Sequence, residues 1–129
     1  MRAISLWQPW ASLIADGYKQ VETRSWSTGY RGPLAIHAAK KIVDWPSPYI
    51  APLFDDFITE PRDLPRGCVV CVVRLWDVVR ITRHNRPGSP ESEFGDYREG
   101  RFMWRLKLLE RLTKPYPCAG RQGLFEVDL

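Results

Sequence analysis

The apolar positions of this chain fall mostly in short runs separated by turn residues, a pattern typical of β-strands. The longest run, Cys68–Val79, is almost continuously apolar and rich in β-branched residues, which predicts a strand at the centre of a sheet. Five more strands are predicted, at Ala3–Leu6, Gln20–Trp26, Pro33–His37, Phe102–Leu112 and Gly123–Val127. The segment Phe102–Leu112 also fits a helix, and the pattern alone leaves that alternative open.

One segment near the N-terminus has helical spacing instead. Pro9 suits the first turn of a helix, because the N–H that proline lacks has no partner there. Gly17 is placed to end this helix in a left-handed conformation. Three apolar residues at positions i, i+3 and i+4 form one face of the helix: Trp10, Leu13 and Ile14. A second helical excursion, interrupted by three prolines, is predicted over Lys40–Thr59.

Turns and one long polar loop complete the predicted organisation. Turns are expected at Ser27–Tyr30 and Leu64–Gly67, and a polar loop at Ile81–Gly100. About six short strands with this spacing favour an α+β fold built on a small β-barrel with flanking helices. Closing the sheet would remove its exposed edges. We expect residues 1–129 to form a single domain.

Composition is that of an ordinary globular domain and excludes several other classes. Hydrophobic residues make up 44% of the 129 positions and charged residues 26%, which argues against wholesale disorder. No apolar run approaches a membrane span. The apolar N-terminal stretch is broken by Gln8 and Pro9, so it does not resemble a signal peptide. An odd count of three cysteines disfavours a disulfide framework, and we expect a cytoplasmic protein.

The net charge of +4 comes entirely from the second half of the chain. Residues 1–61 carry six basic and six acidic groups, whereas residues 62–129 carry 13 basic and nine acidic groups. The densest basic stretch runs from Arg74 to Arg86. A positive field attracts polyanions, and arginine both grips phosphate and stacks on bases. This distribution is compatible with nucleic-acid binding and equally with a solvated basic surface.

The segment Gly17–Trp26 places two cations and a carboxylate within six residues, where the predicted helix gives way to a strand. Strand alternation puts Glu22, Arg24 and Trp26 on one face. Lys19 has the opposite parity, and it joins that face only if the entry turn or a bulge rotates it. If it does, we expect the three charged groups to form a cluster in a water-accessible hollow, with the carboxylate held ionised by two cations.

Such a cluster supports two kinds of chemistry. Lys19 and Arg24 could bind a phosphate group. Alternatively, Glu22 could move a proton while Lys19 activates a nucleophile or stabilises an oxyanion, which would make both residues catalytic. A surface salt bridge with little energetic value is the plain structural alternative.

Aromatic and charged residues nearby extend the candidate site. Among the many aromatic residues, Trp26 and Tyr30 are the best placed to stack on a base, a contact worth about 1–3 kcal/mol. Arg31 follows Tyr30 directly and is a further candidate for phosphate contact. Asp96 and Tyr97 lie in the polar loop, and we expect them to line the hollow opposite the charged cluster, because long loops in compact domains are often functional.

Other groups capable of chemistry have simpler interpretations. His37 lies in an apolar strand, so it is either a core histidine or a general base in the cleft. Cys68 and Cys71 form a C-x-x-C inside a strand, where positions three apart point to opposite faces. No second pair of cysteines or histidines accompanies them, so the sequence predicts neither a metal site nor a cofactor.

The opening segment, Ile4–Trp26, resembles the ASCH domain family. The family signature G-x-K-x-x-E-x-R is met by Gly17, Lys19, Glu22 and Arg24, and the upstream Gln8–Ala11 also resembles that family. Further similar blocks follow in order along the chain: Tyr30–Lys40, Leu64–Val73, Glu93–Leu106 and Gly120–Val127. The resemblance covers nearly the whole chain, with residues 41–63 the least similar part.

This resemblance implies a PUA-like β-barrel with a cleft beside the signature that accepts RNA or a modified nucleotide. Members of the family include nucleic-acid binders, a bacterial ribonuclease and small acetylcytidine amidohydrolases. The amidohydrolases use a lysine, a threonine and a distant glutamate; their lysine corresponds to Lys19, whereas their threonine position holds Glu22 here. Glu91 and Glu93, in the polar loop, are the candidates for the distant glutamate.

Three functions follow as hypotheses. The first is a small domain that binds RNA, single-stranded nucleic acid or a modified nucleotide. The second is a hydrolase that acts on RNA or on a modified nucleoside such as acetylcytidine. The third is a protein-interaction module that uses a tryptophan-rich surface. The sequence leaves the oligomeric state open and indicates no membrane partner.

Overall fold

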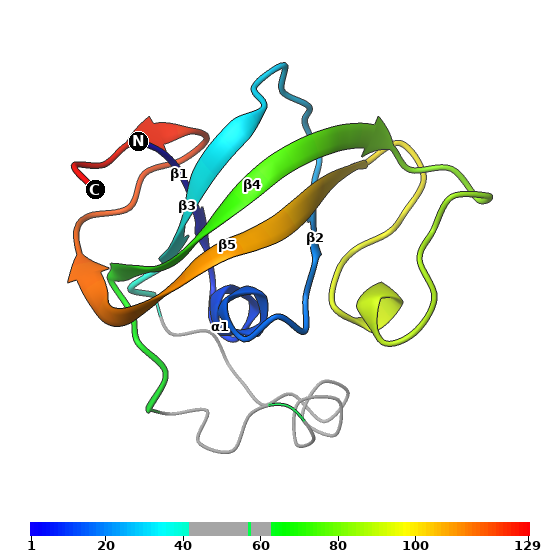
Figure 1. The fold of residues 1–129 in the computed structure, drawn as a ribbon. Coiled ribbons are helices and arrows are strands. Elements are labelled where there is room, and N and C mark those ends of the chain that lie inside the picture. Colours follow the sequence, from blue (N-terminus) through cyan, green and yellow to red (C-terminus); the bar gives the residue numbers. More distant parts are fainter. Residues whose placement is uncertain (42–56, 58–62) are drawn as a thin grey trace.

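A computed structural model of the chain describes residues 1–41, 57 and 63–129. Its main feature is one mixed sheet of six strands in the order β2-β5-β4-β3-β1-β6 (Figure 1). The strands are β1 (Arg2–Leu6), β2 (Val21–Arg24), β3 (Gly32–Ala38), β4 (Cys68–Arg80), β5 (Phe102–Pro117) and β6 (Phe125–Glu126). A single turn-and-a-half helix, α1 (Trp10–Ala15), and a short 3-10 helix, η2 (Glu91–Glu93), accompany the sheet. The predicted α+β class is confirmed.

The sheet is predominantly antiparallel, with one parallel pair. Strand β1 runs parallel to β3, with Ala3 opposite Ala35, whereas the pairs β3–β4, β4–β5, β2–β5 and β1–β6 are antiparallel. The two long strands β4 and β5 form a twisted ribbon that spans the molecule in Figure 1. A strand of this length pairs on both sides and so gives the shorter strands a common template.

The expectation of a closed barrel is not confirmed. In the described part of the chain the sheet is open, with β2 at one end of the strand order and β6 at the other. These end strands have only four and two residues, too few to build a second ladder across the gap. A side chain bridges part of this distance: the guanidinium Nη2 of Arg24 donates to the carbonyl of Ser5 in β1 at 2.7 Å. Short edge strands of this kind limit edge-to-edge pairing without closure.

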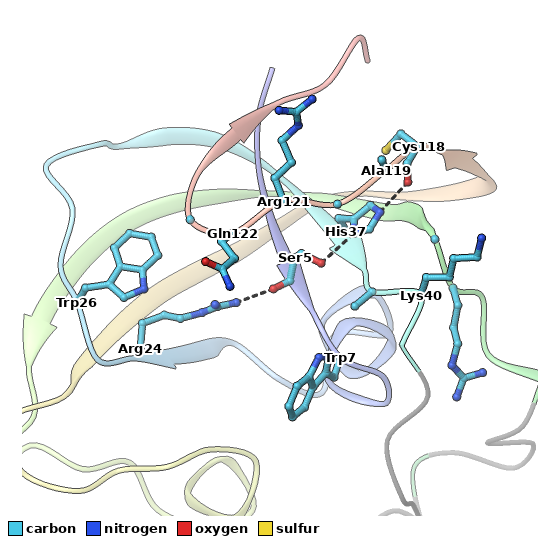
Figure 2. Close-up of a pocket in the computed structure, with 15 residues that line it drawn as sticks. Ser5, Trp7, Arg24, Trp26, His37, Lys40, Cys118, Ala119, Arg121 and Gln122 are labelled. Carbon is cyan, nitrogen blue, oxygen red and sulfur yellow. Dashed lines mark hydrogen bonds between the residues drawn. The ribbon is translucent and has the colours of Figure 1, made fainter.

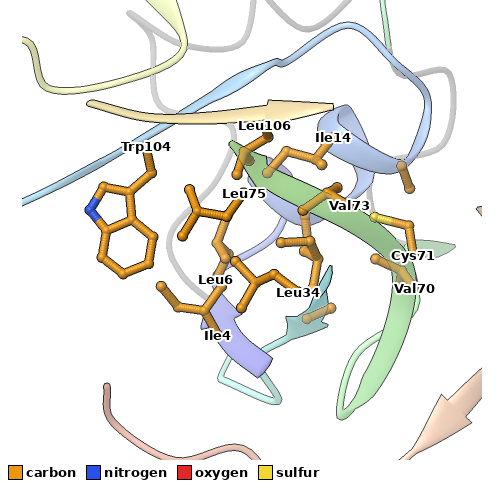
Figure 3. Close-up of a cluster of buried hydrophobic side chains, with 14 of the residues drawn as sticks. Ile4, Leu6, Ile14, Leu34, Val70, Cys71, Val73, Leu75, Trp104 and Leu106 are labelled. Atoms are coloured by element: carbon orange, nitrogen blue, oxygen red, sulfur yellow. The ribbon is translucent and has the colours of Figure 1, made fainter. Parts of the chain in front are cut away.

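Helix α1 covers one face of the sheet and closes the main core. Ala11, Leu13 and Ile14 are almost fully buried. Gly17 follows the helix at a φ of +84°, so the predicted left-handed end is confirmed. Figure 3 shows the core cluster, in which apolar side chains from the strands and the helix meet: Ile4, Leu6, Ile14, Leu34, Val70, Cys71, Val73, Leu75, Trp104 and Leu106.

A β-bulge in β4 brings Cys71 to a different face of the sheet from the one that strict strand alternation predicts. The register between β4 and β5 shifts between Val69 and Cys71. As a result Cys68 and Cys71 belong to the same core cluster, and the expectation that they point to opposite faces is wrong. Both thiols are free and buried, and burial raises the pKa of Cys71 to about 12. They therefore act as small core hydrophobes.

Other elements differ from the pattern mainly at their ends. The segment expected at Gln20–Trp26 forms a shorter strand, β2, and β5 extends five residues beyond Leu112. The helical alternative for β5 is wrong, because this segment pairs with both β2 and β4. The excursion predicted over Lys40–Thr59 lies outside the described residues, apart from positions 40, 41 and 57. Among the helices that the structure describes, none has the length and apolar character needed to cross a membrane.

Candidate functional site

Lys19 is a buried cation rather than a surface one. Its side chain has no exposed area, and its Nζ donates to the carbonyl of Val21 and, at 2.7 Å, to the carbonyl of Phe94. The ammonium also lies 5.6 Å from the ring centroid of Trp10. Burial lowers the pKa of Lys19, while the nearby carboxylates of Glu22 and Glu91 oppose that shift. Lys19 thus satisfies backbone carbonyls beneath the surface.

The three charged residues of the signature do converge. The Nζ of Lys19 lies 3.8 Å from Oε1 of Glu22, and the Nε of Arg24 donates to Oε2 of Glu22 at 3.0 Å. Glu22 is 14% exposed and Arg24 23%, so both reach solvent while Lys19 does not. The carboxylate is therefore held from below by a buried cation and from the side by a partly exposed one.

The chain places Lys19 here through the turn that follows α1. The backbone N–H groups of Tyr18 and Lys19 both donate to the carbonyl of Leu13, which wraps the chain back under the helix end. Strand β2 then pairs with β5, with Glu22 opposite Trp104. The rotation that strand parity required of Lys19 is supplied by this entry turn.

A second carboxylate approaches the same cluster from the polar loop. An Oε1 of Glu91 accepts a hydrogen bond from the backbone N–H of Gln20, while its Oε2 is buried and has no hydrogen-bond partner among the described residues. Burial raises the pKa of Glu91, although the hydrogen bond from Gln20 and the charge of Lys19 act in the opposite direction. Glu93 is exposed and lies at the edge of the groove described next.

Two hollows meet at Arg24 of the signature. The first, the signature groove, has a volume of about 740 Å³ and lies between β2 and the polar loop. The second, the basic pocket, has a volume of about 1110 Å³ and lies between β1, the end of β3 and the segment 118–123. Four residues line both hollows and so join them into one cleft: Ser5, Trp7, Arg24 and Trp26.

The basic pocket is lined by cations. Arg24, Lys40, Arg66 and Arg121 line it, and among the described residues no Asp or Glu does. Figure 2 labels Arg24, Lys40 and Arg121. The Nε of Arg66 is buried and has no hydrogen-bond partner among the described residues. At the rim, the ammonium of Lys41 lies 5.3 Å from the ring centroid of Trp7. Arg24 is paired with Glu22, so the pocket offers an anion mainly the positive charges of the other three cations.

A serine and a histidine form the back wall of the basic pocket. The Oγ of Ser5 lies 2.9 Å from Nδ1 of His37, and Nε2 of His37 lies 2.9 Å from the carbonyl oxygen of Cys118. His37 is 1% exposed, so the sequence-based alternative of a buried histidine holds, but its partner Ser5 is partly exposed to the cleft. Figure 2 shows both side chains between β1, β3 and the segment that carries Cys118.

Gly120 packs directly on this pair. A Cβ at position 120 would lie 2.7 Å from Cε1 of His37 and 3.1 Å from Oγ of Ser5. Atoms that close cannot be accommodated without a shift of the ring or of the segment 118–123. The absence of a side chain at Gly120 therefore lets this segment form the pocket wall.

The structure brings some of the predicted residues together and separates others. Trp26 lines both hollows and packs edge-on against Trp104 at 4.8 Å between centroids. Asp96 lines the signature groove, where its carboxylate pairs with Arg98 and Arg101. In the described residues, then, the groove contains the expected carboxylates of Glu22 and Asp96 together with Arg24.

Tyr30, Arg31 and Tyr97 line neither hollow in the described structure. The hydroxyl of Tyr30 donates to the carbonyl of Pro33, and the Arg31 guanidinium donates to the carbonyls of Thr28 and Tyr30. Tyr97 is buried against Ile81 and Met103, and burial raises its pKa. The dense basic stretch is also separate, because its arginines are exposed and do not line the basic pocket.

Among the pocket residues that the sequence did not identify as candidates are Ser5, Lys40, Arg66 and Arg121. They come from different strands and loops, so no local spacing links them. Each nevertheless lies in one of the blocks that resemble the ASCH family. Those blocks are the signal that could have found them. In the described ranges, no three His, Cys, Asp or Glu side chains gather in a way that could hold a metal ion.

Comparison with known proteins identifies the family of this chain. The sequence model of the ASCH domain matches residues 4–115. Activating signal cointegrator 1 from Mus musculus is 30% identical over 133 residues, a match that covers 97% of this chain and 22% of that protein. The same protein from Homo sapiens gives the same identity and coverage. The chain thus spans about a fifth of the length of these curated relatives. The match of the family model over most of its length shows that this chain belongs to the ASCH domain family.

Proposed function

We propose that this domain binds RNA, single-stranded nucleic acid or a nucleotide in the cleft formed by the basic pocket and the signature groove. The observation that carries the proposal is the set of four cations around a pocket of about 1110 Å³ that no carboxylate of the described part of the chain lines. A phosphate group would supply the missing negative charge. The excess of arginine over lysine suits this role, because a guanidinium binds phosphate through two parallel N–H donors.

The cation set explains how phosphate would be held. Arg66 has a buried Nε whose hydrogen is unused, and burying a polar group without a partner costs free energy. A phosphate oxygen at that atom would remove the cost. Arg121 and Lys40 are exposed and line the same pocket, so they can contact the same anion. The Nη2 of Arg24 is fixed by the Ser5 carbonyl, so its guanidinium is already oriented at the junction of the two hollows.

Aromatic walls would hold the base. Trp7 is 49% exposed and Trp26 is partly exposed, and both line each hollow. An indole offers a large face on which any base can stack. Trp104 supports Trp26 from behind, since its indole N–H donates to the Trp26 carbonyl at 3.3 Å.

In this proposal Lys19 is a positioning residue. Its ammonium is buried and donates to the Val21 and Phe94 carbonyls. Arg24 and the other pocket cations, rather than Lys19, would therefore contact the phosphate. The alternative of hydrolysis by Lys19 and Glu22 has less support, because the Nζ of Lys19 does not reach the groove. A protein-interaction role would use other exposed aromatics, such as Trp76.

Variants of the pocket cations test the proposal. We expect the full chain to bind a fluorescein-labelled single-stranded hexanucleotide, and the double variant Arg66→Gln with Arg121→Gln to bind it at least tenfold more weakly, as measured by fluorescence anisotropy. Arg74→Gln is the matched control, because Arg74 is exposed on β4 and lines neither hollow. No binding at low salt, or equal losses in the control and the pocket variant, would overturn the proposed function.

A further inference from the structure

The hydrogen bonds of His37 determine whether the Ser5 hydroxyl donates or accepts a hydrogen bond. The Cys118 carbonyl oxygen can only accept, so Nε2 of His37 must carry the hydrogen of that 2.9 Å bond. In the neutral imidazole the other nitrogen, Nδ1, is then an acceptor. The 2.9 Å contact between Nδ1 and Oγ therefore requires the Ser5 hydroxyl to donate.

This arrangement leaves Ser5 with acceptor capacity only. Its hydroxyl hydrogen is used by His37, and its backbone carbonyl already accepts from Arg24. Gly120 packs against both members of the pair, so the segment 118–123 leaves the hydroxyl little freedom to rotate. What Ser5 presents to the cleft is a lone pair of Oγ, at the position where the two hollows join.

The lone pair on Oγ of Ser5 favours a ligand group that can donate a hydrogen bond. With phosphate on the cations and a base between Trp7 and Trp26, the group that meets Ser5 belongs to the edge of the base. An exocyclic amino group of cytosine or adenine can donate to Oγ. Uracil and hypoxanthine carry a carbonyl oxygen at the same ring position, and that oxygen would face the lone pair and leave both acceptors unpaired.

We propose that Ser5, held by His37, is a specificity-determining acceptor that selects bases with an amino group at C4 of a pyrimidine or C6 of a purine, cytosine or adenine, over their carbonyl counterparts. This inference rests on the proposed function, because it assumes that the cleft holds a nucleotide. It assigns base selection to a serine outside the G-x-K-x-x-E-x-R signature. His37 acts through Ser5 and is a positioning residue.

Four labelled RNA hexamers test the proposal: oligocytidine, oligouridine, oligoadenosine and oligoinosine. Within each pair of matched bases, we expect the full chain to bind the amino form about three- to tenfold more tightly by fluorescence anisotropy, the effect of one neutral hydrogen bond. Ser5→Ala should remove both preferences. Ser25→Ala is the matched control, because Ser25 lines the groove but has no such histidine partner, and it should retain them.

Each outcome is informative. Binding of all four hexamers with equal affinity by the unaltered chain would overturn the proposal and leave the proposed function standing. A preference that survives in Ser5→Ala would also overturn it, whereas absence of all binding would overturn both. If Ser5→Ala does not fold, an N4,N4-dimethylcytidine hexamer replaces the variant: without its donor hydrogens it should bind the unaltered chain no better than oligouridine, and binding equal to oligocytidine would refute the role of Ser5.

Discussion

The ionisable side chains at the start of β2 differ greatly in their access to water, and this difference separates their roles. Lys19 is buried and engaged by backbone carbonyls, whereas Glu22 and Arg24 reach the groove. A buried ammonium with good partners is costly to remove, because the carbonyls it leaves behind remain desolvated. The lysine of the signature thus supports the groove, and the arginine is its surface cation.

Glu91 gives a pH-dependent prediction at this scale. Burial raises its pKa above the ordinary value of 4.5, so the folded state binds the proton of Glu91 more tightly than the unfolded state. The contribution of this group to stability is therefore fully present below about pH 4.5 and is lost as pH rises through the folded-state pKa. We expect Glu91→Gln to be as stable as the unaltered chain at pH 4 and more stable at pH 7, since glutamine keeps an acceptor for the Gln20 N–H without the charge.

Urea denaturation at both pH values measures this difference. Glu93→Gln is the control, because Glu93 is exposed in the same short helix and should show no comparable change. A Glu91→Gln variant that loses stability at pH 7 would show that the charge itself is required there, for example by Lys19.

At the scale of elements, the polar loop is attached to the sheet at a small number of points. The Phe94 side chain is 1% exposed and packs with Leu13 of α1, its carbonyl accepts from Lys19, and the Asp96 N–H donates to Thr23 of β2 at 3.1 Å. These contacts hold one wall of the signature groove. The loop is polar overall, so its two buried aromatic residues, Phe94 and Tyr97, carry much of its burial.

Phe94→Ala should weaken the attachment of the polar loop, one wall of the signature groove, to α1. We expect the free energy of unfolding to fall by about 3 kcal/mol, the usual cost of truncating a buried phenylalanine, and amide hydrogen exchange to accelerate in residues 81–101 more than in β4. Leu109→Ala is the control, because Leu109 is 46% exposed on β5 and should change neither quantity appreciably. Uniform acceleration across the sheet would show that the loop and the sheet unfold as one unit.

At the scale of the whole molecule, the positive charge is divided between two regions. The basic pocket collects cations from four separate segments, whereas the exposed arginines between positions 74 and 86 lie outside it. The first region would contact phosphate, and the second would contribute to the long-range field that raises the rate of encounter. Only contacts that release counterions change the salt dependence of affinity.

The salt dependence of binding separates these regions. The logarithm of the association constant for a single-stranded hexanucleotide should fall linearly with the logarithm of salt concentration, with a slope of about −0.7 for each phosphate contacted. We expect Arg121→Gln to reduce the slope by about 0.7 and Arg74→Gln to leave it unchanged, as measured by anisotropy titrations between about 50 and 200 mM salt. A slope near zero in the unaltered chain would show that phosphate is not the main contact.

Hydrophobic periodicity by itself determined the elements. Short apolar runs bounded by turn residues located six strands, one of them with a helical alternative, and the i, i+3, i+4 spacing with Gly17 located α1, because both patterns depend on local geometry. The charged cluster at Lys19, Glu22 and Arg24 was also predictable, since all three lie within six residues. Local pattern could not place the Val69–Cys71 bulge, nor show that the sheet stays open, because both depend on pairing between distant strands.

Tertiary structure alone decided which charges meet water and which residues form the pocket. Lys19 is buried because the loop carrying Phe94 folds over it from 75 residues away. The basic pocket joins Ser5, His37, Arg66 and Arg121, which lie far apart in sequence and come together only when β1, β3 and the segment 118–123 pack. Sequence spacing encodes contacts between near neighbours, whereas the burial and the hydrogen-bond polarity of a side chain depend on what the rest of the chain places against it.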